Sequence, residues 1–225
     1  MVWEDALNFD LISDDLKNDK DIVIAAVTQK PFVFTLLSEE MKDDKNVVME
    51  AVSREGYYLR DASKRLKDDE EVVLTAYKED PFLIELASER LRADKEFMIK
   101  AIDIHPQAID YLSEDLKNDK ELIMYALNKF PDLFSCINET LRNDLEIATL
   151  VISRNGFLLE YASKELRDNK ELALVAIKSA VHAFNFVSER LKNDKEIQDL
   201  VETEITKQAK NCLFSFPPKE YEKME

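Results

Sequence analysis

Apolar and polar residues follow a pattern that repeats every 25 residues along the 225-residue chain. In each repeat except the last, an Asp or Asn is followed by apolar residues at offsets of 3, 4, 7 and 8, the spacing of one face of an α-helix. In the first repeat these residues are Ile22, Val23, Ala26 and Val27. The pattern predicts a helix of about ten residues in every repeat. The marker residues are Asp19, Asp44, Asp69, Asp94, Asp119, Asp144, Asn169 and Asp194.

The marker residue is predicted to cap the N-terminus of its helix. An Asp or Asn side chain there accepts a hydrogen bond from a backbone N–H that has no partner within the first turn. An acidic residue usually follows two positions later, as Glu71 follows Asp69, where the positive end of the helix dipole favours a carboxylate. These acidic residues are expected to form a column along the stack, partly neutralised by lysines one position earlier.

A second helix is predicted to begin at a proline or glycine such as Pro31, with Val181 as the exception. Proline suits a first helical turn, and glycine suits a left-handed residue after a helix end. Its apolar stripe in the first repeat is Phe34, Leu37 and Met41. A serine recurs within it, and its hydroxyl is expected to bond back to a carbonyl of the preceding turn. An Asn near its end, such as Asn118, is expected to be left-handed. The serine positions are Ser13, Ser38, Ser63, Ser88, Ser113, Ser163 and Ser188, with Asn138 in place of one serine.

Helices of this length are not stable alone in water, so they must stack on their neighbours. The predicted fold is an all-α α-solenoid of about eight 25-residue two-helix repeats over residues 1–201. Residues 202–225 are assigned to a C-terminal capping extension and tail. Within them, Phe214 and Phe216 belong to an apolar segment that the repeat does not require. The segment is interpreted as a cap over the last repeat, with a docking motif for a partner as the alternative.

Composition disfavours several classes of function. With 31 Lys and Arg against 47 Asp and Glu, the formal net charge is −16, which disfavours nucleic acids and anionic membranes as partners. Two glycines leave no material for a glycine-rich phosphate loop, and two His and two Cys disfavour a four-ligand zinc site. No cofactor is therefore expected. No signal peptide or membrane-spanning apolar run is visible, and a cytoplasmic protein is expected.

The sequence contains no converging set of catalytic residues. His105 and His182 lie more than three repeats apart, and the acidic pairs recur with the repeat instead of meeting at one point. Asp61 departs from the repeat, since other repeats have Leu, Tyr, Cys or Phe there, and it is expected to be exposed or to pair with Arg54 or Arg65. Cys136 occupies the same column and is expected in the core.

The sixth repeat is the most irregular and is the candidate for partner binding. Leu145 replaces the usual Lys or Glu after the cap and is expected to be exposed. Phe130 and Leu150 could extend an apolar patch, which is a typical signature of a protein contact. Sequence drift with local repacking is the structural alternative.

The segments Asp119-Lys120-Glu121, Ser153-Arg154-Asn155-Gly156 and Tyr161-Ala162-Ser163 resemble a tandem-repeat family known as domain of unknown function 4116. The likeness covers residues 7 to about 200, and the chain departs from it where proline replaces Asn-Gly at four of the hinges. Members occur in bacteria, including intracellular pathogens, and in some protists. The resemblance implies a helical interaction module and assigns no catalytic residue.

The predicted function is a non-catalytic protein–protein interaction scaffold, an adaptor or an inhibitor, with an unidentified protein partner. An effector-type protein delivered into a host cell is compatible with the resemblance. The alternatives are an acidic mimic of nucleic acid and an enzyme with an unrecognised carboxylate site. The sequence leaves the oligomeric state open.

Overall fold

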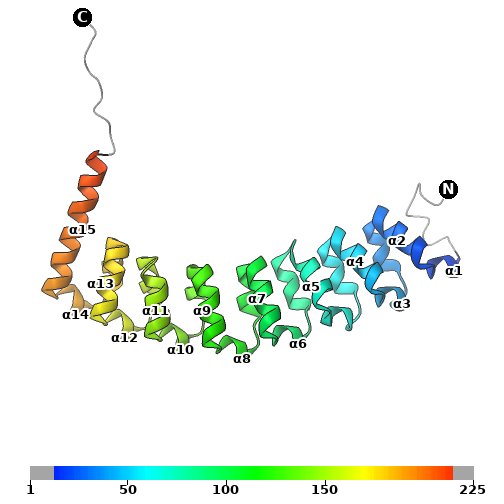
Figure 1. Ribbon diagram of the computed structural model, residues 1–225, viewed down its shortest axis with the longest axis horizontal. Helices are drawn as coiled ribbons and strands as arrows, with labels where there is room; N and C mark the ends of the chain where they lie inside the picture. The colour runs from blue at the N-terminus through cyan, green and yellow to red at the C-terminus, as the bar shows by residue number, and fades with distance from the viewer. Residues whose placement is uncertain (1–12, 215–225) are drawn as a thin grey trace, which may run out of the picture. The chain divides into compact units, whose positions relative to one another are not determined.

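The computed structural model describes residues 13–214, and the regular elements in that range are all helices (Figure 1). The all-α solenoid of 25-residue repeats predicted from the sequence is confirmed. The chain divides into two compact units, Met1–Leu122 (unit 1) and Ile123–Glu225 (unit 2). Each unit is described by itself.

The first helix of each repeat begins one residue after the Asp or Asn marker, as predicted. Asp44 has an extended backbone, and its carboxylate accepts hydrogen bonds from the amides of Asn46 and Val47 at 2.9 and 3.2 Å. The amide of Phe97 donates to Asp94 in the same way at 2.9 Å. These contacts confirm the predicted N-caps. The first helices are α2 (Lys20–Gln29), α4 (Lys45–Arg54), α5 (Glu70–Tyr77), α7 (Lys95–Ile104), α9 (Lys120–Lys129), α11 (Leu145–Ile152), α13 (Lys170–Ser179) and α15 (Lys195–Phe214).

The second half of each repeat is two short helices instead of the one continuous helix expected. In the first repeat a 3₁₀-helix, η2 (Pro31–Leu36), ends at Leu37, whose backbone is extended with φ −72° and ψ 156°. A four-residue α-helix, α3 (Glu39–Lys42), follows. The other 3₁₀-helices are η3 (Gly56–Asp61), η4 (Leu66–Asp68), η5 (Pro81–Leu86), η6 (Pro106–Tyr111), η7 (Pro131–Ser135), η8 (Gly156–Tyr161) and η9 (Val181–Phe186). The other short α-helices are α1 (Asp14–Lys17), α6 (Glu89–Arg92), α8 (Glu114–Lys117), α10 (Glu139–Arg142), α12 (Lys164–Arg167) and α14 (Glu189–Lys192).

The repeated serine accounts for this break. Oγ of Ser38 accepts the amide hydrogen of Met41 at 3.4 Å, so the serine starts a new helix instead of lying inside one. The expectation that the serine hydroxyl bonds back to a preceding carbonyl is therefore wrong. The expected left-handed residue at the end of the second helix is also wrong, since Asn118 has φ −103° and ψ −1°.

In unit 1 the helices α2, α4, α5 and α7 lie side by side, and the 3₁₀-helices η2, η3, η5 and η6 contact one another in the same order (Figure 1). Phe34 and Tyr58 meet edge to face between η2 and η3, with ring centroids 5.8 Å apart. A Cβ on Gly56 would overlap the carbonyl oxygen of Ala76, which is itself fully buried. Close approach of two repeats, and not the left-handed turn expected, therefore requires this glycine.

In unit 2 the helices α11, α13 and α15 pack in order, and η8 contacts η9. Helix α15 continues past residue 201, where the repeat pattern ends, and its residues from 206 to 210 are exposed. The side chain of Phe214 and all of Phe216 lie outside the described residues. The assignment of residues 202–225 to a capping extension and tail stays a prediction.

The difference between a cap and a core residue gives a first prediction. Asp94→Ala should reduce the free energy of unfolding by about 1 kcal/mol, because one amide of α7 loses its acceptor. Leu116→Ala should cost about 2–5 kcal/mol, because Leu116 is buried in the packing of α8. Urea unfolding followed by circular dichroism measures both values. A larger cost for Asp94→Ala than for Leu116→Ala would contradict these roles.

Candidate protein-binding surface

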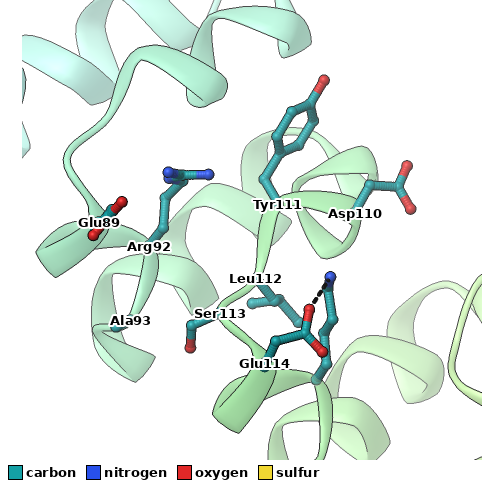
Figure 2. Close-up of a pocket in the computed structure, with 9 residues that line it drawn as sticks. Glu89, Arg92, Ala93, Asp110, Tyr111, Leu112, Ser113 and Glu114 are labelled. Atoms are coloured by element: carbon teal, nitrogen blue, oxygen red, sulfur yellow. Dashed lines mark hydrogen bonds and ion pairs between the residues drawn. The ribbon is translucent and has the colours of Figure 1, made fainter.

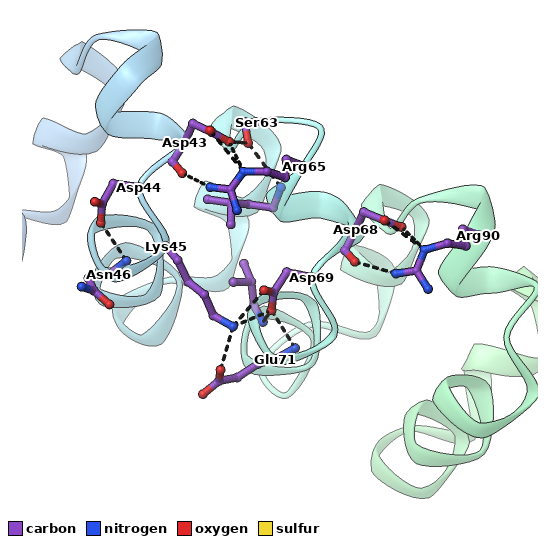
Figure 3. A network of polar contacts seen from close by, with 12 residues as sticks. Asp43, Asp44, Lys45, Asn46, Ser63, Arg65, Asp68, Asp69, Glu71 and Arg90 are labelled. Carbon is purple, nitrogen blue, oxygen red and sulfur yellow. Dashed lines mark hydrogen bonds and ion pairs between the residues drawn. The ribbon is translucent and has the colours of Figure 1, made fainter.

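Neighbouring repeats are joined by an ion pair that we call the lysine clip. The first residue of α4, Lys45, reaches the capping carboxylate of the next repeat, with Nζ 2.8 Å from Oδ2 of Asp69 (Figure 3). The same Nζ is 2.9 Å from Oε2 of Glu71. One carboxylate thus caps its own helix and binds the previous repeat. Further lysine clips join Lys20 to Asp44, Lys95 to Asp119 and Glu121, and Lys170 to Asp194 and Glu196.

A second contact, the serine clip, joins the short α-helices. Ser63 donates its hydroxyl hydrogen to Asp43 of the previous repeat, and Nε of Arg65 donates to the same oxygen at 3.0 Å (Figure 3). Elsewhere Asn replaces the Asp, and Ser163 donates to Oδ1 of Asn143 at 2.5 Å. The further serine clips are Ser88 and Arg90 on Asp68, Ser188 and Arg190 on Asp168, and Ser38 on Asn18.

The residue types in the serine clip change together. Each Asp at the clip position is followed 22 residues later by Arg, whereas an Asn or Ala there is followed by an acidic residue or Thr. Coulomb attraction explains the first pairing, and avoidance of like charges explains the second. The residue types display this pairing, but the sequence analysis did not use it. The pairs with Asp at the clip position are Asp43–Arg65, Asp68–Arg90 and Asp168–Arg190. The pairs with an uncharged residue at the clip position are Asn18–Glu40, Ala93–Asp115, Asn118–Thr140 and Asn143–Glu165.

Hydrogen bonds within the clips hold the pKa values of Asp43, Asp68, Asp119, Asp168 and Asp194 below the usual range. The Ser63 hydroxyl and then the Arg65 guanidinium lower the pKa of Asp43 by hydrogen bonding to the charged form. The Lys95 ammonium, followed by a backbone amide, lowers the pKa of Asp119. These carboxylates are charged at neutral pH, and their charge is used to hold repeats together.

At the end of the third repeat Ala93 stands where other repeats have Asp or Asn, and a pocket of about 490 Å³ lies beside it (Figure 2). Arg92, Tyr111 and Ser113 line this pocket. Oγ of Ser113 accepts the amide hydrogen of Leu116 at 3.3 Å, but its hydroxyl hydrogen has no acceptor among the described residues. Nε of Arg92 is also buried without a hydrogen-bond partner in the part of the chain that is described.

Large apolar side chains are exposed at one position of the 3₁₀-helices. In unit 1 the second residues of η2, η3 and η5 are Phe32, Tyr57 and Phe82, with 45, 47 and 72% of their surface exposed. We call these three residues the aromatic row, because their helices contact one another in order. In unit 2 Phe157 occupies the same position of η8. The sequence analysis missed this row because it followed the apolar stripe that is buried.

The structure exposes Leu145 as predicted, but it does not gather the three candidate residues of the sixth repeat into one patch. Leu145 begins α11, and Leu150 lies five positions later, which turns it about 140° around the helix. Phe130 lies near the other end of α11, where Arg154 donates to the carbonyl oxygen of Asn128 at 2.5 Å. Leu150 and Phe130 are half-buried.

Leu145 also removes one lysine clip between neighbouring repeats. It occupies the position of the clip lysine, and the next capping residue is Asn169 instead of Asp. Both partners of one lysine clip are therefore replaced by uncharged residues. Oδ1 of Asn169 still accepts the amide hydrogen of Leu172 at 3.0 Å, so the cap of α13 is kept while the ion pair is absent.

Asp61 does not find the partners expected for it. Arg54 binds Glu50 at 3.1 Å, and Arg65 binds Asp43. The carboxylate of Asp61 lies at the end of η3 and is half-buried, so it keeps access to solvent.

Cys136 is exposed, which corrects its expected place in the core. Leu36 and Tyr161, at the equivalent position of their repeats, are also exposed. This column lies at or next to the last residue of the 3₁₀-helices and faces the surface, although its residues are mostly apolar.

Of the two histidines, His182 is exposed on η9, whereas His105 has structural contacts. The ring of His105 packs edge to face on Tyr77 with centroids 5.1 Å apart, and its Nε2 is 3.1 Å from the carbonyl oxygen of Lys78. Among the described residues, no group of three or more His, Cys, Asp or Glu is arranged to hold a metal ion. No helix within residues 13–214 is both long enough and apolar enough to cross a membrane.

Comparison with known proteins agrees with this architecture. A family model described as domain of unknown function (DUF4116) matches residues 4–42, 44–92, 94–142, 119–167 and 144–192. No curated protein and no solved structure matches the chain. The matched segments end at residue 192, just before the capping residue of α15.

The serine clips predict a dependence of stability on pH. The pKa of Asp68 is lower in the folded chain than the value of about 3.9 for a free Asp, so its contribution is present above pH ~4 and is lost as the pH falls below that. Asp68→Asn should therefore lower the urea midpoint at pH 6, and the difference from the unmodified chain should shrink as the pH approaches 2. Asp110→Asn, at an exposed position outside the clips, should change the midpoint at neither pH. An equal effect of Asp68→Asn at both pH values would contradict the ion pair.

The missing lysine clip can be rebuilt. Leu145→Lys combined with Asn169→Asp should stabilise the chain by about 0.2–1 kcal/mol beyond the sum of the single substitutions, because together they restore an exposed ion pair. The coupling free energy is measured by a double-mutant cycle in urea at low salt, and it should shrink in 1 M salt. Additive single effects would show that the lysine clips contribute no stability.

Proposed function

We propose that this chain, which belongs to the DUF4116 family, is a non-catalytic scaffold that binds a partner protein along its repeats. The family gives no activity to transfer, so the proposal depends on the surface. A stack of repeats presents the same positions at regular intervals, which suits recognition of an extended partner surface.

The observation that carries the proposal is the aromatic row. Phe32, Tyr57 and Phe82 leave about half or more of their surface in solvent, while the chain has other aromatic residues fully buried. Exposing a phenyl ring costs free energy that burial would recover. Aromatic side chains at the centre of interfaces often dominate binding, so this row is the candidate anchor.

The charge around the aromatic row indicates the chemistry of the partner. Glu55 and Glu85 are exposed beside it, and Asp80 lies two residues before Phe82. With a net charge of −16 for the whole chain, long-range attraction favours a partner that carries basic residues around an apolar contact.

The acidic-mimic alternative has weaker support. Within the acidic positions expected to form a column, Lys45 binds Glu71 and Lys95 binds Glu121. A mimic of nucleic acid needs an unbalanced field, and the lysine clips reduce it. An enzyme with a carboxylate site is also less supported, because the carboxylates of the clips already bind Lys, Ser or Arg.

Leu145 is the second candidate contact, since it is exposed at a position where other repeats have Lys or Glu.

A cytoplasmic location, with delivery into a host cell if the chain is an effector, is also part of the proposal.

The aromatic row gives the functional prediction. The full chain is used as bait, and the recovered partner is then purified. The double variant Phe32→Ser and Phe82→Ser should weaken binding of that partner by more than about tenfold, because two interface anchors are lost. Thermal unfolding should change little, since both side chains are exposed. Calorimetric titration measures the affinity.

Phe157→Ser is the matched control, because it removes an exposed ring at the same repeat position in unit 2. Its affinity should stay within about twofold of the unmodified chain. If Leu145→Lys alone abolished binding while the double variant did not, the site would lie at the sixth repeat. If none of these changes affected affinity, the surface proposal would be wrong.

A further inference from the structure

We propose that the pocket beside Ala93 binds an uncharged side-chain carboxamide, that of an Asn or Gln of the partner. This inference rests on the proposed function for the source of the ligand, and on the chain's own repeats for its chemistry. The pocket is lined by groups of α6, η6 and α8, all within unit 1 (Figure 2).

Other repeats show what occupies this position. Where the third repeat has Ala93, five described repeats place a side-chain oxygen that accepts the hydroxyl hydrogen of the serine 20 residues later. Ser113 of the fourth repeat is the equivalent serine, and its hydroxyl has no acceptor among the described residues. The junction of the third and fourth repeats therefore keeps the donor of a serine clip and lacks the acceptor. The occupied positions are Asn18, Asp43, Asp68, Asn143 and Asp168.

A ligand oxygen can supply this acceptor without disturbing the backbone. The amide of Ser113 donates to the carbonyl of Arg92 at 3.1 Å, which is the same contact that Ser188 makes with Arg167 at 3.0 Å. Ala93 has φ −99° and ψ −3°, close to the φ −93° and ψ 0° of Asn193. The backbone geometry of a serine clip is thus present, and only the acceptor side chain is missing.

The surrounding charge selects a carboxamide over a carboxylate. Each Asp in a serine clip is bound by an Arg, but the equivalent residue beside Ser113 is Asp115. Glu89, Asp110 and Glu114 also line the pocket, against the basic residues Arg92 and Lys117. Lys117 is already bound to Glu114 at 2.8 Å, so acidic groups outnumber basic ones around the pocket. A carboxylate would meet these acidic groups, whereas an amide oxygen accepts the hydrogen bond without repulsion.

A second polar contact is available to the amide nitrogen. Nδ2 of Asn118 donates to the carbonyl of Glu114 at 2.7 Å, and Nδ2 of Asn193 donates to the carbonyl of Glu189 at 2.8 Å. The equivalent carbonyl here is that of Glu89, a residue that lines the pocket. This carbonyl oxygen already accepts the amide hydrogen of Ala93 at 3.0 Å, so a ligand amide would use its second lone pair. The pocket therefore matches both ends of a carboxamide, and its volume of about 490 Å³ leaves room for the adjoining chain.

The test uses small probes, so it does not require the partner. The ¹⁵N-labelled full chain is titrated with N-acetyl-asparagine methylamide, and we expect saturable shifts at the amides of Ala93 and Ser113. The Kd should be on the order of 1–10 mM, which suits a ligand of this size. N-acetyl-aspartate methylamide and N-acetyl-alanine methylamide at pH 7 should bind at least about tenfold more weakly. No saturable shift, or equal binding of the alanine probe, would overturn the inference.

Two variants locate the binding. Ala93→Asn supplies the missing group within the chain, so it should raise the melting temperature and weaken the probe at least about tenfold. Asn143→Ala removes the acceptor of the Ser163 hydroxyl. Glu165 lies two residues after Ser163, just as Asp115 lies two residues after Ser113. This variant should therefore create a second probe site, with new shifts at the Ser163 amide. Probe binding that Ala93→Asn leaves unchanged would place the ligand elsewhere and refute the assignment.

The outcome is independent of the aromatic row. If the asparagine probe binds but the double variant Phe32→Ser and Phe82→Ser keeps full partner affinity, the proposed surface fails and the pocket assignment stands. If the probe does not bind, the pocket assignment fails whatever the aromatic row does.

Discussion

The capping carboxylate is the interaction on which the rest of the structure depends. Asp69 accepts the amides of Glu71 and Val72 at the start of α5, and the same carboxylate binds Lys45 of the previous repeat. One side chain therefore fixes where a helix begins and how two repeats are aligned. Because a helix of eight to ten residues is unstable alone, its start and its neighbour must be specified together. The serine clip does the same for the short helices.

Much of the fold could be predicted because its signals are local. The apolar spacing behind each marker gave the first helices, and the marker residue gave their caps. The second half of the repeat was less predictable, since spacings of three and four between Phe34, Leu37 and Met41 fit an α-helix and also a 3₁₀-helix followed by a capped turn. Ser38 decides between them, because its Oγ binds an amide three residues ahead.

The candidate surface was harder to predict than the core. The sequence analysis assigned the column of Cys136 to the interior because its residues are mostly apolar, but the end of a 3₁₀-helix faces solvent there. The exposed Phe82 is the second residue of η5 and precedes the buried Leu83, and hydrophobicity alone cannot separate the two. The pocket beside Ala93 required knowledge of which residues 20 positions apart touch. Only Leu145 was found directly, since it breaks a charge pattern visible along the chain.

For the proposed function, departures from the clips therefore matter more than the clips themselves. A position that keeps one half of a repeated contact, as Ser113 does, has a defined chemistry available to a ligand. A position where both halves change, as at Leu145 and Asn169, has lost the contact without leaving a polar group unsatisfied. The first kind suits recognition of a partner, and the second kind weakens one junction between repeats.

The central claim is that one shared carboxylate holds both a helix start and a repeat junction. Native-state hydrogen exchange tests it most directly at amides that have the same local hydrogen bond. The amides of Val72 and Leu122 donate to Asp residues that also bind a clip lysine. The amides of Phe97 and Leu172 donate to Asp94 and Asn169. For these two caps, the position of the clip lysine in the previous repeat is occupied by Glu70 and Leu145. The account predicts slower exchange for Val72 and Leu122 than for Phe97 and Leu172, with the difference shrinking in high salt. Equal protection of all four amides, or the opposite order, would contradict it.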